Sequence, residues 1–285
     1  MKNALVLLCL SAAAAAQPPV LAKLDHVQLV VRNHKACSDT LAELGFRLPA
    51  HQHTNDGSEQ SASFFADRSY LELITPSADL NDRLNKPRVA FLRRREGLYF
   101  AALEVEPLEP AIPRLRSAGM LVSDVVKGSY LSTHVEPWWP DALPVWFLQY
   151  LAHRDRDERQ DNGATAIAAV TLVVRDPAAE LPQIAAFATV DAKEHEFATI
   201  GAIGSVAAIP RGGAIRIVTP KSADGIAGTF LHAQGEGLMS VTFRVNDVAA
   251  LAKYLADRRV PFEREGESLV VASARGCSAR MEFVE

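Results

Sequence analysis

One acidic residue stands inside an apolar stretch and raises the first question about chemistry. Between Ser69 and Pro76 the chain is largely apolar, and Glu72 is its one acid. On an extended chain alternate residues share a face, so Glu72 shares its face with Tyr70 and Ile74. Burying an ionised carboxylate on a strand costs several kcal/mol unless a cation, a metal ion or hydrogen-bond donors meet it. The sequence therefore predicts a specific partner for Glu72.

A histidine on an earlier strand is the candidate partner. Residues 24–31 alternate like a half-polar strand, with His26, Gln28 and Val30 on one face. An imidazole can bind a metal together with a carboxylate, or it can hydrogen-bond to the carboxylate directly. From the residues alone the second arrangement is an open alternative. It consists of a buried bond between His26 and Glu72, completed by Tyr70 or Gln28, with no metal.

The elements around these residues follow the order β-α-β-β-β. Asn33 is expected to cap an amphipathic helix over residues 34–44, and Gly45 is expected to end it. A short strand is expected to begin at Phe46, and a tight turn is predicted at residues 67–69. The remaining predicted elements of the first half are strands over 61–66, 69–76, 97–105, 121–126 and 145–151 and a helix over 108–118.

The second half repeats the first half. Residues 167–174 match 24–31, and residues 214–220 match 70–76. Likewise, residues 237–245 match 97–105, a helix is predicted over 247–257, and a last strand over 279–285. Four β-α-β-β-β modules in one chain predict an α+β protein with two domains.

The start of the chain predicts export. Residues 1–16 have a basic start, a short apolar core and a small-residue end, as in a secretory signal peptide. Cleavage after Ala16 would give a periplasmic or secreted protein with no membrane anchor. The apolar run is shorter than the roughly 20 residues that span a bilayer. We expect Cys37 and Cys277 to be free, buried thiols, with a disulfide as the alternative.

Composition excludes one class of partner. The chain has 30 basic and 34 acidic residues in its 285, for a formal net charge of −4, and its bases are dispersed. Nucleic-acid binding needs a concentrated basic surface, so we expect no such partner. The oligomeric state is left open, a homodimer included.

The module pattern resembles the vicinal-oxygen-chelate superfamily. The motifs that carry the resemblance open a module at residues 24–27, close it at 70–74, and recur at 237–245 and 281–284. Shorter similarities to its glyoxalase-like branch lie at residues 53–60 and 138–149. The resemblance implies two open barrels in tandem. The charged, turn-rich residues 154–163 are expected to form a solvated linker, which leaves an N-terminal barrel over 24–153 and a C-terminal barrel over 164–285.

The resemblance also implies four ligand positions in each barrel. In the first half they are His26, Glu72, Phe100 and Gln149. In the second half they are Ala169, Arg216, Ser240 and Glu282. We therefore place a divalent metal, which could be zinc, nickel, iron or manganese, on His26, Glu72 and Gln149, and we regard the second barrel as structural.

Four further residues are candidates for contacting a substrate. They are His53, Gln60, Trp138 and Trp139. His53 and Gln60 precede the strand of Glu72, and the tryptophan pair would form an apolar lid over the mouth of the barrel. The alternatives are an exposed loop histidine and packing of the tryptophans at the domain junction.

Two functions remain in competition. The first is an exported, metal-dependent lyase or isomerase in which Glu72 acts as base on a small compound that chelates the metal through adjacent oxygens. A dioxygenase is less consistent with Phe100 at a ligand position. The second is a binding or sequestering protein for small molecules that has lost the metal.

Overall fold

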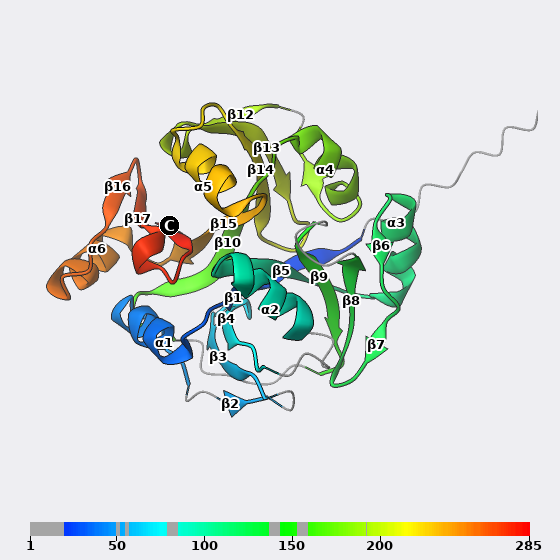
Figure 1. Cartoon of the computed structure of the whole chain (residues 1–285), viewed down its shortest axis with the longest axis horizontal. Helices are drawn as coiled ribbons and strands as arrows, with labels where there is room; N and C mark the ends of the chain where they lie inside the picture. Colours follow the sequence, from blue (N-terminus) through cyan, green and yellow to red (C-terminus); the bar gives the residue numbers. More distant parts are fainter. Residues whose placement is uncertain are drawn as a thin grey trace, which may run out of the picture.

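The computed structural model describes residues 20–49, 52–54, 57–78, 85–136, 143–152, 159–191 and 193–285. Within these residues the chain forms two mixed sheets of nine strands each, and the sheets lie against one another with helices at their outer margins (Figure 1). Neither sheet closes on itself, so each is an open barrel. The expected α+β fold with tandem modules is confirmed.

The first sheet comes from the first half of the chain. Its order is β2-β3-β4-β1-β5-β9-β8-β6, and β7 pairs with β8. The bounds of its strands are β1 Ala22–Val30, β2 Gln52–His53, β3 Glu59–Phe64, β4 Tyr70–Thr75, β5 Gly97–Val105, β6 Leu121–Val122, β7 Val126–Lys127, β8 Tyr130–Glu136 and β9 Val145–Tyr150.

The second sheet has the corresponding order, β11-β13-β14-β10-β15-β18-β17-β16, and β12 pairs with β13. The bounds of its strands are β10 Ala164–Val173, β11 Thr189–Val190, β12 His195–Phe197, β13 Ala202–Ala208, β14 Ala214–Pro220, β15 Gly237–Val245, β16 Glu263–Glu265, β17 Ser268–Val271 and β18 Arg280–Val284.

Helices connect and cover the strands. Among the described residues they are α1 His34–Glu43, α2 Asn85–Arg94, α3 Ile112–Ser117, α4 Pro177–Ile184, α5 Ile226–Gln234 and α6 Val248–Asp257, with short 3₁₀ turns at Glu109–Ala111, Ala198–Ile200 and Ser273–Arg275. No helix in the described ranges is both long enough and apolar enough to cross a membrane.

The pairing of strands repeats between the halves. β1 is parallel to β4 and antiparallel to β5, and β5 is parallel to β9. In the same way β10 is parallel to β14 and antiparallel to β15, and β15 is parallel to β18. Equivalent positions in the two halves can therefore be identified from the registers of these strand pairs.

One apolar core joins the two sheets. Alternate residues of β1, such as Val27 and Leu29, face this core, as the alternation of the strand predicts. Across the junction the rings of Phe46 and Phe243 lie 4.9 Å apart. The opposite face of β1 carries His26 and belongs to a separate cavity of the first sheet.

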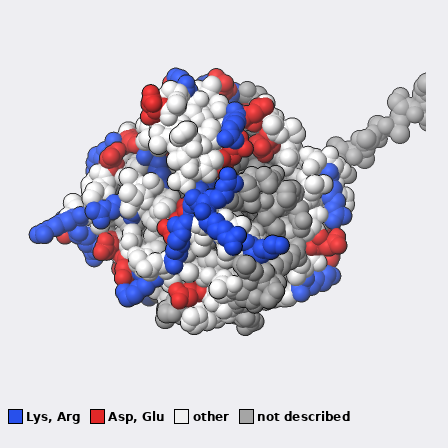
Figure 2. Space-filling view, in the orientation of Figure 1, with Lys and Arg blue, Asp and Glu red and all other residues white. Residues whose placement is uncertain are grey.

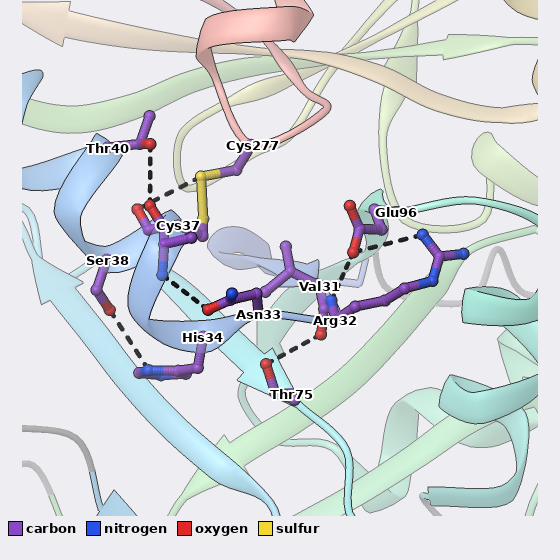
Figure 3. The surroundings of a disulfide bond; sticks show 11 residues. Val31, Arg32, Asn33, His34, Cys37, Ser38, Thr40, Thr75, Glu96 and Cys277 are labelled. Atoms are coloured by element: carbon purple, nitrogen blue, oxygen red, sulfur yellow. Dashed lines mark hydrogen bonds and ion pairs between the residues drawn. A yellow bond between two sulfur atoms is a disulfide. The ribbon is translucent and has the colours of Figure 1, made fainter.

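A disulfide also joins the two halves, so the expectation of free thiols is wrong. Cys37 on α1 is bonded to Cys277 in the loop before β18, across a sequence separation of 240 residues (Figure 3). Sequence distance alone suggested that the two cysteines would not meet. The packing of the two sheets brings α1 to the C-terminal loop.

Part of the predicted linker is built into the first barrel. Residues 153–158 lie outside the described residues, but Gln160 accepts a hydrogen bond from the Arg47 amide at 2.8 Å and donates to the Phe64 carbonyl at 2.7 Å. Asn162 is buried and donates to the Leu44 carbonyl at 3.0 Å. The polar side chains of this segment thus satisfy backbone groups of the C-cap of α1, of the loop after it and of β3.

Helices α2 and α5 and strand β8 are among the elements that were not expected from the sequence. Helices α2 and α5 fill the connections between modules in the two halves, and β8 precedes β9. Residues 46–48 do not form the expected strand. Helix α2 matters most for function, because it covers the cavity of the first sheet.

Candidate functional site

The first sheet encloses a cavity of about 360 Å³ on the face of β1 that carries His26. Its polar lining residues include His26, Glu72 and Arg88, and its aromatic lining residues include Phe100, Tyr130 and Trp146. A pocket with apolar walls and a few convergent polar groups is the usual form of a small-molecule site.

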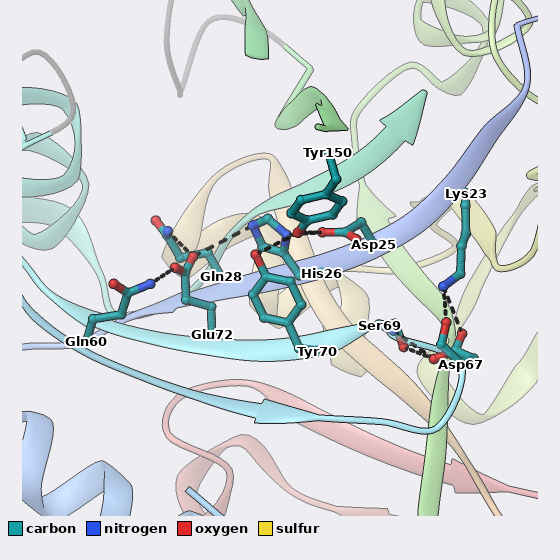
Figure 4. Close-up of polar contacts among 10 residues, drawn as sticks. All are labelled: Lys23, Asp25, His26, Gln28, Gln60, Asp67, Ser69, Tyr70, Glu72 and Tyr150. Carbon is teal, nitrogen blue, oxygen red and sulfur yellow. Dashed lines mark hydrogen bonds and ion pairs between the residues drawn. The ribbon is translucent and has the colours of Figure 1, made fainter. Parts of the chain in front are cut away.

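Asp25 and His26 form a buried pair beside this cavity. Asp25 is 2% exposed, and its Oδ2 lies 2.6 Å from Nδ1 of His26 (Figure 4). Neighbouring residues on a regular strand point to opposite faces, but the register of β1 with β5 shifts between Leu24 and His26. This irregularity lets both side chains serve one site.

The contact fixes the tautomer of the imidazole. An ionised carboxylate only accepts hydrogen bonds, so Nδ1 of His26 donates to Asp25 and Nε2 of the neutral ring is an acceptor. The ring stacks on Tyr70 with centroids 4.3 Å apart and meets the edge of Phe100 at 5.7 Å. These aromatic contacts hold the plane of the ring.

Two amides hold the carboxylate of Glu72. Gln28 donates to its Oε2 at 2.5 Å, and Gln60 donates to its Oε1. These donors are the partners that an acid on a covered strand requires, and Glu72 is 7% exposed. Its Oε2 lies 3.7 Å from Nε2 of His26, too far for a direct hydrogen bond. His26 Nε2 and Glu72 Oε2, both acceptors, thus face each other and could share one hydrogen-bond donor or cation.

Tyrosines complete the polar side. The hydroxyl of Tyr150 donates to Asp25 at 3.0 Å. Burial raises the pKa of Tyr70 well above its usual value, and the negative charges of Asp25 and Glu72 raise it further. Burial likewise raises the pKa of Tyr130, with a further contribution from Glu72 that Arg88 opposes. Both phenols are therefore protonated at neutral pH.

The predicted site residues divide into three groups. His26, Glu72 and Gln60 come together in the cavity. His53 lies on β2 with an exposed side chain and is not among the residues that line the cavity. Trp138 and Trp139 lie outside the described residues.

Gln149 does not join His26 and Glu72. Its side-chain oxygen accepts a hydrogen bond from the Leu108 amide at 2.8 Å. On β9 the residues that line the cavity are Trp146, Leu148 and Tyr150, so Gln149 has the opposite strand parity and faces away. The predicted ligand set of His26, Glu72 and Gln149 is not assembled.

The registers show which residue stands in the fourth ligand position. In the second sheet Ala169 pairs with Thr242, which pairs with Glu282. In the first sheet His26 pairs with Ala102, which pairs with Trp146. Trp146 is therefore equivalent to Glu282, and the sequence match of Gln149 with Glu282 was wrong.

The registers agree with the other two predicted equivalences, that of Glu72 with Arg216 and that of Phe100 with Ser240. Gln28 pairs with both Glu72 and Phe100. Its counterpart Thr171 pairs with Arg216 and Ser240.

The donor set does not fit the metal centre that the superfamily resemblance implies. His26 and Glu72 would suit two ligands, because Asp25 and the amides orient them as outer-shell partners do. Phe100 and Trp146 at the other two positions offer no oxygen or nitrogen ligand of the required kind. Within the described residues no three His, Cys, Asp or Glu side chains gather in one such cluster. We therefore derive no chemical step through a metal.

The second sheet fills the same positions with an ion-pair network. Arg216 Nη1 lies 2.6 Å from Glu282 Oε2, which also accepts from the Thr242 hydroxyl at 3.0 Å. Arg280 contacts the other oxygen of Glu282 at 3.3 Å. Burial raises the pKa of Glu282, but the Arg216 and Arg280 charges and the Thr242 hydroxyl more than offset this, so the net pKa is lowered. The network supports the structural role expected for the second barrel.

Asp25, Arg88 and Trp146 are among the residues at the cavity that the sequence analysis did not identify as site candidates. Asp25 was missed because regular alternation places it opposite His26, and only the irregular pairing of β1 reverses this. Arg88 was missed because α2 was not predicted. Trp146 was missed because the exact register of β9 cannot be read from an apolar run, although aromatic residues at alternate positions were a usable signal.

The comparisons with known proteins agree with this fold. A family profile described as a glyoxalase-like domain matches residues 24–187, more than half of the chain. The chain therefore belongs to the glyoxalase-like family, within the vicinal-oxygen-chelate superfamily. No curated protein matches it.

Solved structures with low sequence identity share the whole architecture. A triple mutant of 4-hydroxymandelate synthase from Streptomyces coelicolor is similar with a TM-score of 0.66 and 15% identity, over 93% of this chain and 92% of that one. A hypothetical protein from Staphylococcus aureus has a TM-score of 0.58 and 11% identity, over 92% and 98% of the two chains.

A third similar structure is a fusion protein of a xylose isomerase-like TIM barrel and 4-hydroxyphenylpyruvate dioxygenase, with a TM-score of 0.61 and 12% identity. The match covers 94% of this chain and 49% of the fusion protein. At these identities the similarities establish the fold and leave the chemistry to be argued from the site.

Proposed function

We propose that this protein is an exported lyase or isomerase that moves a proton on a small oxygenated compound bound in the cavity of the first sheet. The observation that carries the proposal is the arrangement of Asp25, His26 and Glu72, in which an oriented imidazole acceptor faces a carboxylate acceptor across 3.7 Å. General bases in enzymes are held by such partners.

The proposed reaction begins at a carbon that carries hydrogen and lies next to a carbonyl. His26 Nε2 removes the proton, and the electron pair of the C–H bond moves toward the carbonyl oxygen to form an enediolate. Asp25 stabilises the imidazolium that results. Glu72 accepts a hydrogen bond from a substrate hydroxyl and so orients the adjacent oxygen. For an isomer, the His26 imidazolium returns the proton to the former carbonyl carbon while the substrate hydroxyl passes its proton to the enediolate oxygen, so that the C=O bond moves by one carbon. For a lyase product, the electron pair instead expels a leaving group from the carbon β to the carbonyl, and that group takes the proton from His26.

This assignment shifts the role of base from Glu72 to His26. Both carboxylate oxygens of Glu72 already accept amide hydrogen bonds. These bonds leave each oxygen with fewer lone pairs to offer to a substrate C–H. The Nε2 of His26 has the free acceptor lone pair of its tautomer and lines the cavity.

Export remains part of the proposal. Residues 1–16 have the composition of a signal peptide, and the Cys37–Cys277 disulfide is of the kind that persists in oxidising compartments. Fractionation of cells that express the full chain, with N-terminal sequencing of the product, tests this part. Retention of residues 1–16 in a cytoplasmic product would contradict it.

Proton exchange with solvent tests the catalytic part. The mature protein is incubated in D₂O with dihydroxyacetone, glyceraldehyde, acetoin and glycolaldehyde, and loss of the C–H signal is followed by proton NMR. We expect exchange of at least one compound, and we expect H26Q to slow it by about 10²- to 10⁴-fold, the usual contribution of a general base. Exchange that H26Q leaves intact would refute the assignment.

A second histidine–aspartate pair provides the matched control. His195 Nε2 lies 2.7 Å from Asp191 Oδ2 in the second sheet. H195Q removes a histidine of similar pairing away from the cavity, and we expect it to leave exchange unchanged.

A second candidate function is binding or sequestration of a small molecule without turnover. It is favoured by Phe100 and Trp146 at two ligand positions, because aromatic side chains there enlarge the apolar wall of the pocket. Ligand binding by wild type, with no exchange or product for any bound compound, would favour this function over the first.

A further inference from the structure

We propose that the cavity takes small aromatic or planar compounds that carry a carboxylate, and that Arg88 binds the carboxylate. The inference rests on the proposed function in taking this cavity as the ligand site, and it adds the class of compound. Nothing in the family profile or in the similar structures assigns a role to Arg88.

Arg88 brings a permanent charge to the cavity wall. It lies on α2, is 7% exposed and lines the cavity. A guanidinium remains protonated in proteins, so burial cannot neutralise it as it can a lysine. A buried arginine in a pocket is suited to planar recognition of a carboxylate.

An amide relays the contact between Arg88 and Glu72. Nε of Arg88 donates to the Gln28 oxygen at 3.1 Å, and the Gln28 nitrogen donates to Glu72 at 2.5 Å. In the second sheet, by contrast, Arg216 contacts Glu282 directly at 2.6 Å. In the first sheet the side-chain amide of Gln28 thus lies between Arg88 and Glu72. The positive and negative charges therefore occupy different positions on the cavity wall.

Both carboxylates near the cavity already have hydrogen-bond donors of their own. Asp25 lies beside the cavity, where it accepts from His26 and Tyr150. Glu72 accepts from Gln28 and Gln60. These bonds turn both carboxylates toward their donors, and Arg88 on α2 is, with Arg68, one of two arginines among the described residues that line the cavity.

The aromatic wall selects the body of the compound. Phe100 and Trp146 lie with ring centroids 5.2 Å apart, and Tyr130 also faces the cavity. The phenol of Tyr130 is a hydrogen-bond donor at neutral pH and lies within the field of Arg88. Because Phe100 and Trp146 already pack against each other, a ligand ring can lie against the wall that they form while its carboxylate meets Arg88.

The surface around α2 favours approach of an anion. Lys and Arg side chains form the most prominent coloured group near the centre of the face in Figure 2, in the region that α2 occupies in Figure 1. Helix α2 contributes the exposed Arg93 and Arg94 to this side. Clustered charge of one sign raises the encounter rate with ligands of the other sign.

Matched acid and amide probes test the inference. Dissociation constants are measured by calorimetry for benzoate against benzamide and for 3-phenylpropanoate against 3-phenylpropanamide. We expect each acid to bind wild type about tenfold more tightly than its amide, and we expect R88M to reduce the difference to about twofold or less. Equal binding of acids and amides by wild type, or a preference that R88M retains, would overturn the inference.

Controls separate the role of Arg88 in binding from its role in folding. R93M removes an exposed arginine of the same helix, and we expect it to keep the preference. R88K keeps the charge without the planar fork, and we expect it to keep part of the preference. In folded wild type, benzoate and not benzamide should shift the NMR signal of the Arg88 Nε–H, and absence of this shift would also overturn the inference.

The two proposals fail in different ways. Acid binding that depends on Arg88, without proton exchange in any compound, would refute the proposed reaction and uphold the binding role of Arg88. Proton exchange in uncharged compounds that R88M leaves unchanged, with no preference for acids, would uphold the reaction and refute this role.

Discussion

Replacement of Asp25 by asparagine should weaken the preference of His26 for the tautomer that is protonated on Nδ1. In wild type the Asp25 carboxylate accepts from Nδ1 at 2.6 Å and from the Tyr150 hydroxyl at 3.0 Å. A hydrogen bond to a charged group contributes about 1.5–3 kcal/mol, against about 0.5–1.5 kcal/mol for a neutral one. The difference of roughly 1–2 kcal/mol corresponds to a change of about 5- to 30-fold in the preference for the Nδ1–H tautomer. D25N should therefore give a mixture of tautomers where wild type gives one.

Nitrogen NMR of the histidine ring measures this directly and needs no substrate. In wild type we expect a protonated Nδ1 and an unprotonated Nε2 in the neutral ring of His26. In D25N we expect the two nitrogen shifts to move toward each other, and we expect any proton exchange to fall by about the same 5- to 30-fold. Unchanged nitrogen shifts in a folded D25N would refute the argument that Asp25 orients the base.

Two further predictions concern the positions that distinguish the two barrels, and a third concerns the disulfide that joins them. W146E should add a carboxylate beside His26 and Glu72 and so complete a set of three metal ligands. The variant should therefore bind Co²⁺ with a visible absorption band that wild type lacks. R216M should remove the closer of the two cations that contact Glu282 and lower the free energy of unfolding by about 1–3 kcal/mol at neutral pH, as measured by urea denaturation, because Arg280 still compensates the carboxylate. Since the pKa of folded Glu282 is lowered, the stability it contributes is present at neutral pH and is lost as pH falls through that pKa, and R216M should flatten this acid-side decline. Replacement of Cys37 and Cys277 by alanine should lower the free energy of unfolding by about 2–5 kcal/mol, because the bond closes a very long loop.

Each of these predictions has a contrary outcome. Cobalt binding by wild type equal to that of W146E would show that Phe100 and Trp146 do not prevent a metal site. A destabilisation by R216M no larger than that of R244M, which removes an exposed arginine on β15, would show that the network around Glu282 contributes little. A double alanine variant as stable as wild type would show that packing alone holds α1 to the C-terminal loop.

The sequence determined the repeat, the fold class and the inner faces of the strands around the site. Alternation placed His26 and Gln28 on one side of β1 and Val27 and Leu29 on the other, and the structure has this division because a period of two follows from the geometry of an extended chain. The acid on an apolar strand also pointed correctly to Glu72 as a residue with specific partners.

The tertiary structure decided how those faces combine into a site. The irregular pairing in β1 turned Asp25 toward His26, and the register between β5 and β9 put Trp146 where Gln149 had been expected. Helix α2 then placed Arg88 in the wall. A strand's period is a local property of the chain, whereas register and the docking of a helix depend on contacts between distant segments. For this reason the sequence alone could identify His26 and Glu72 but not the residues that surround them.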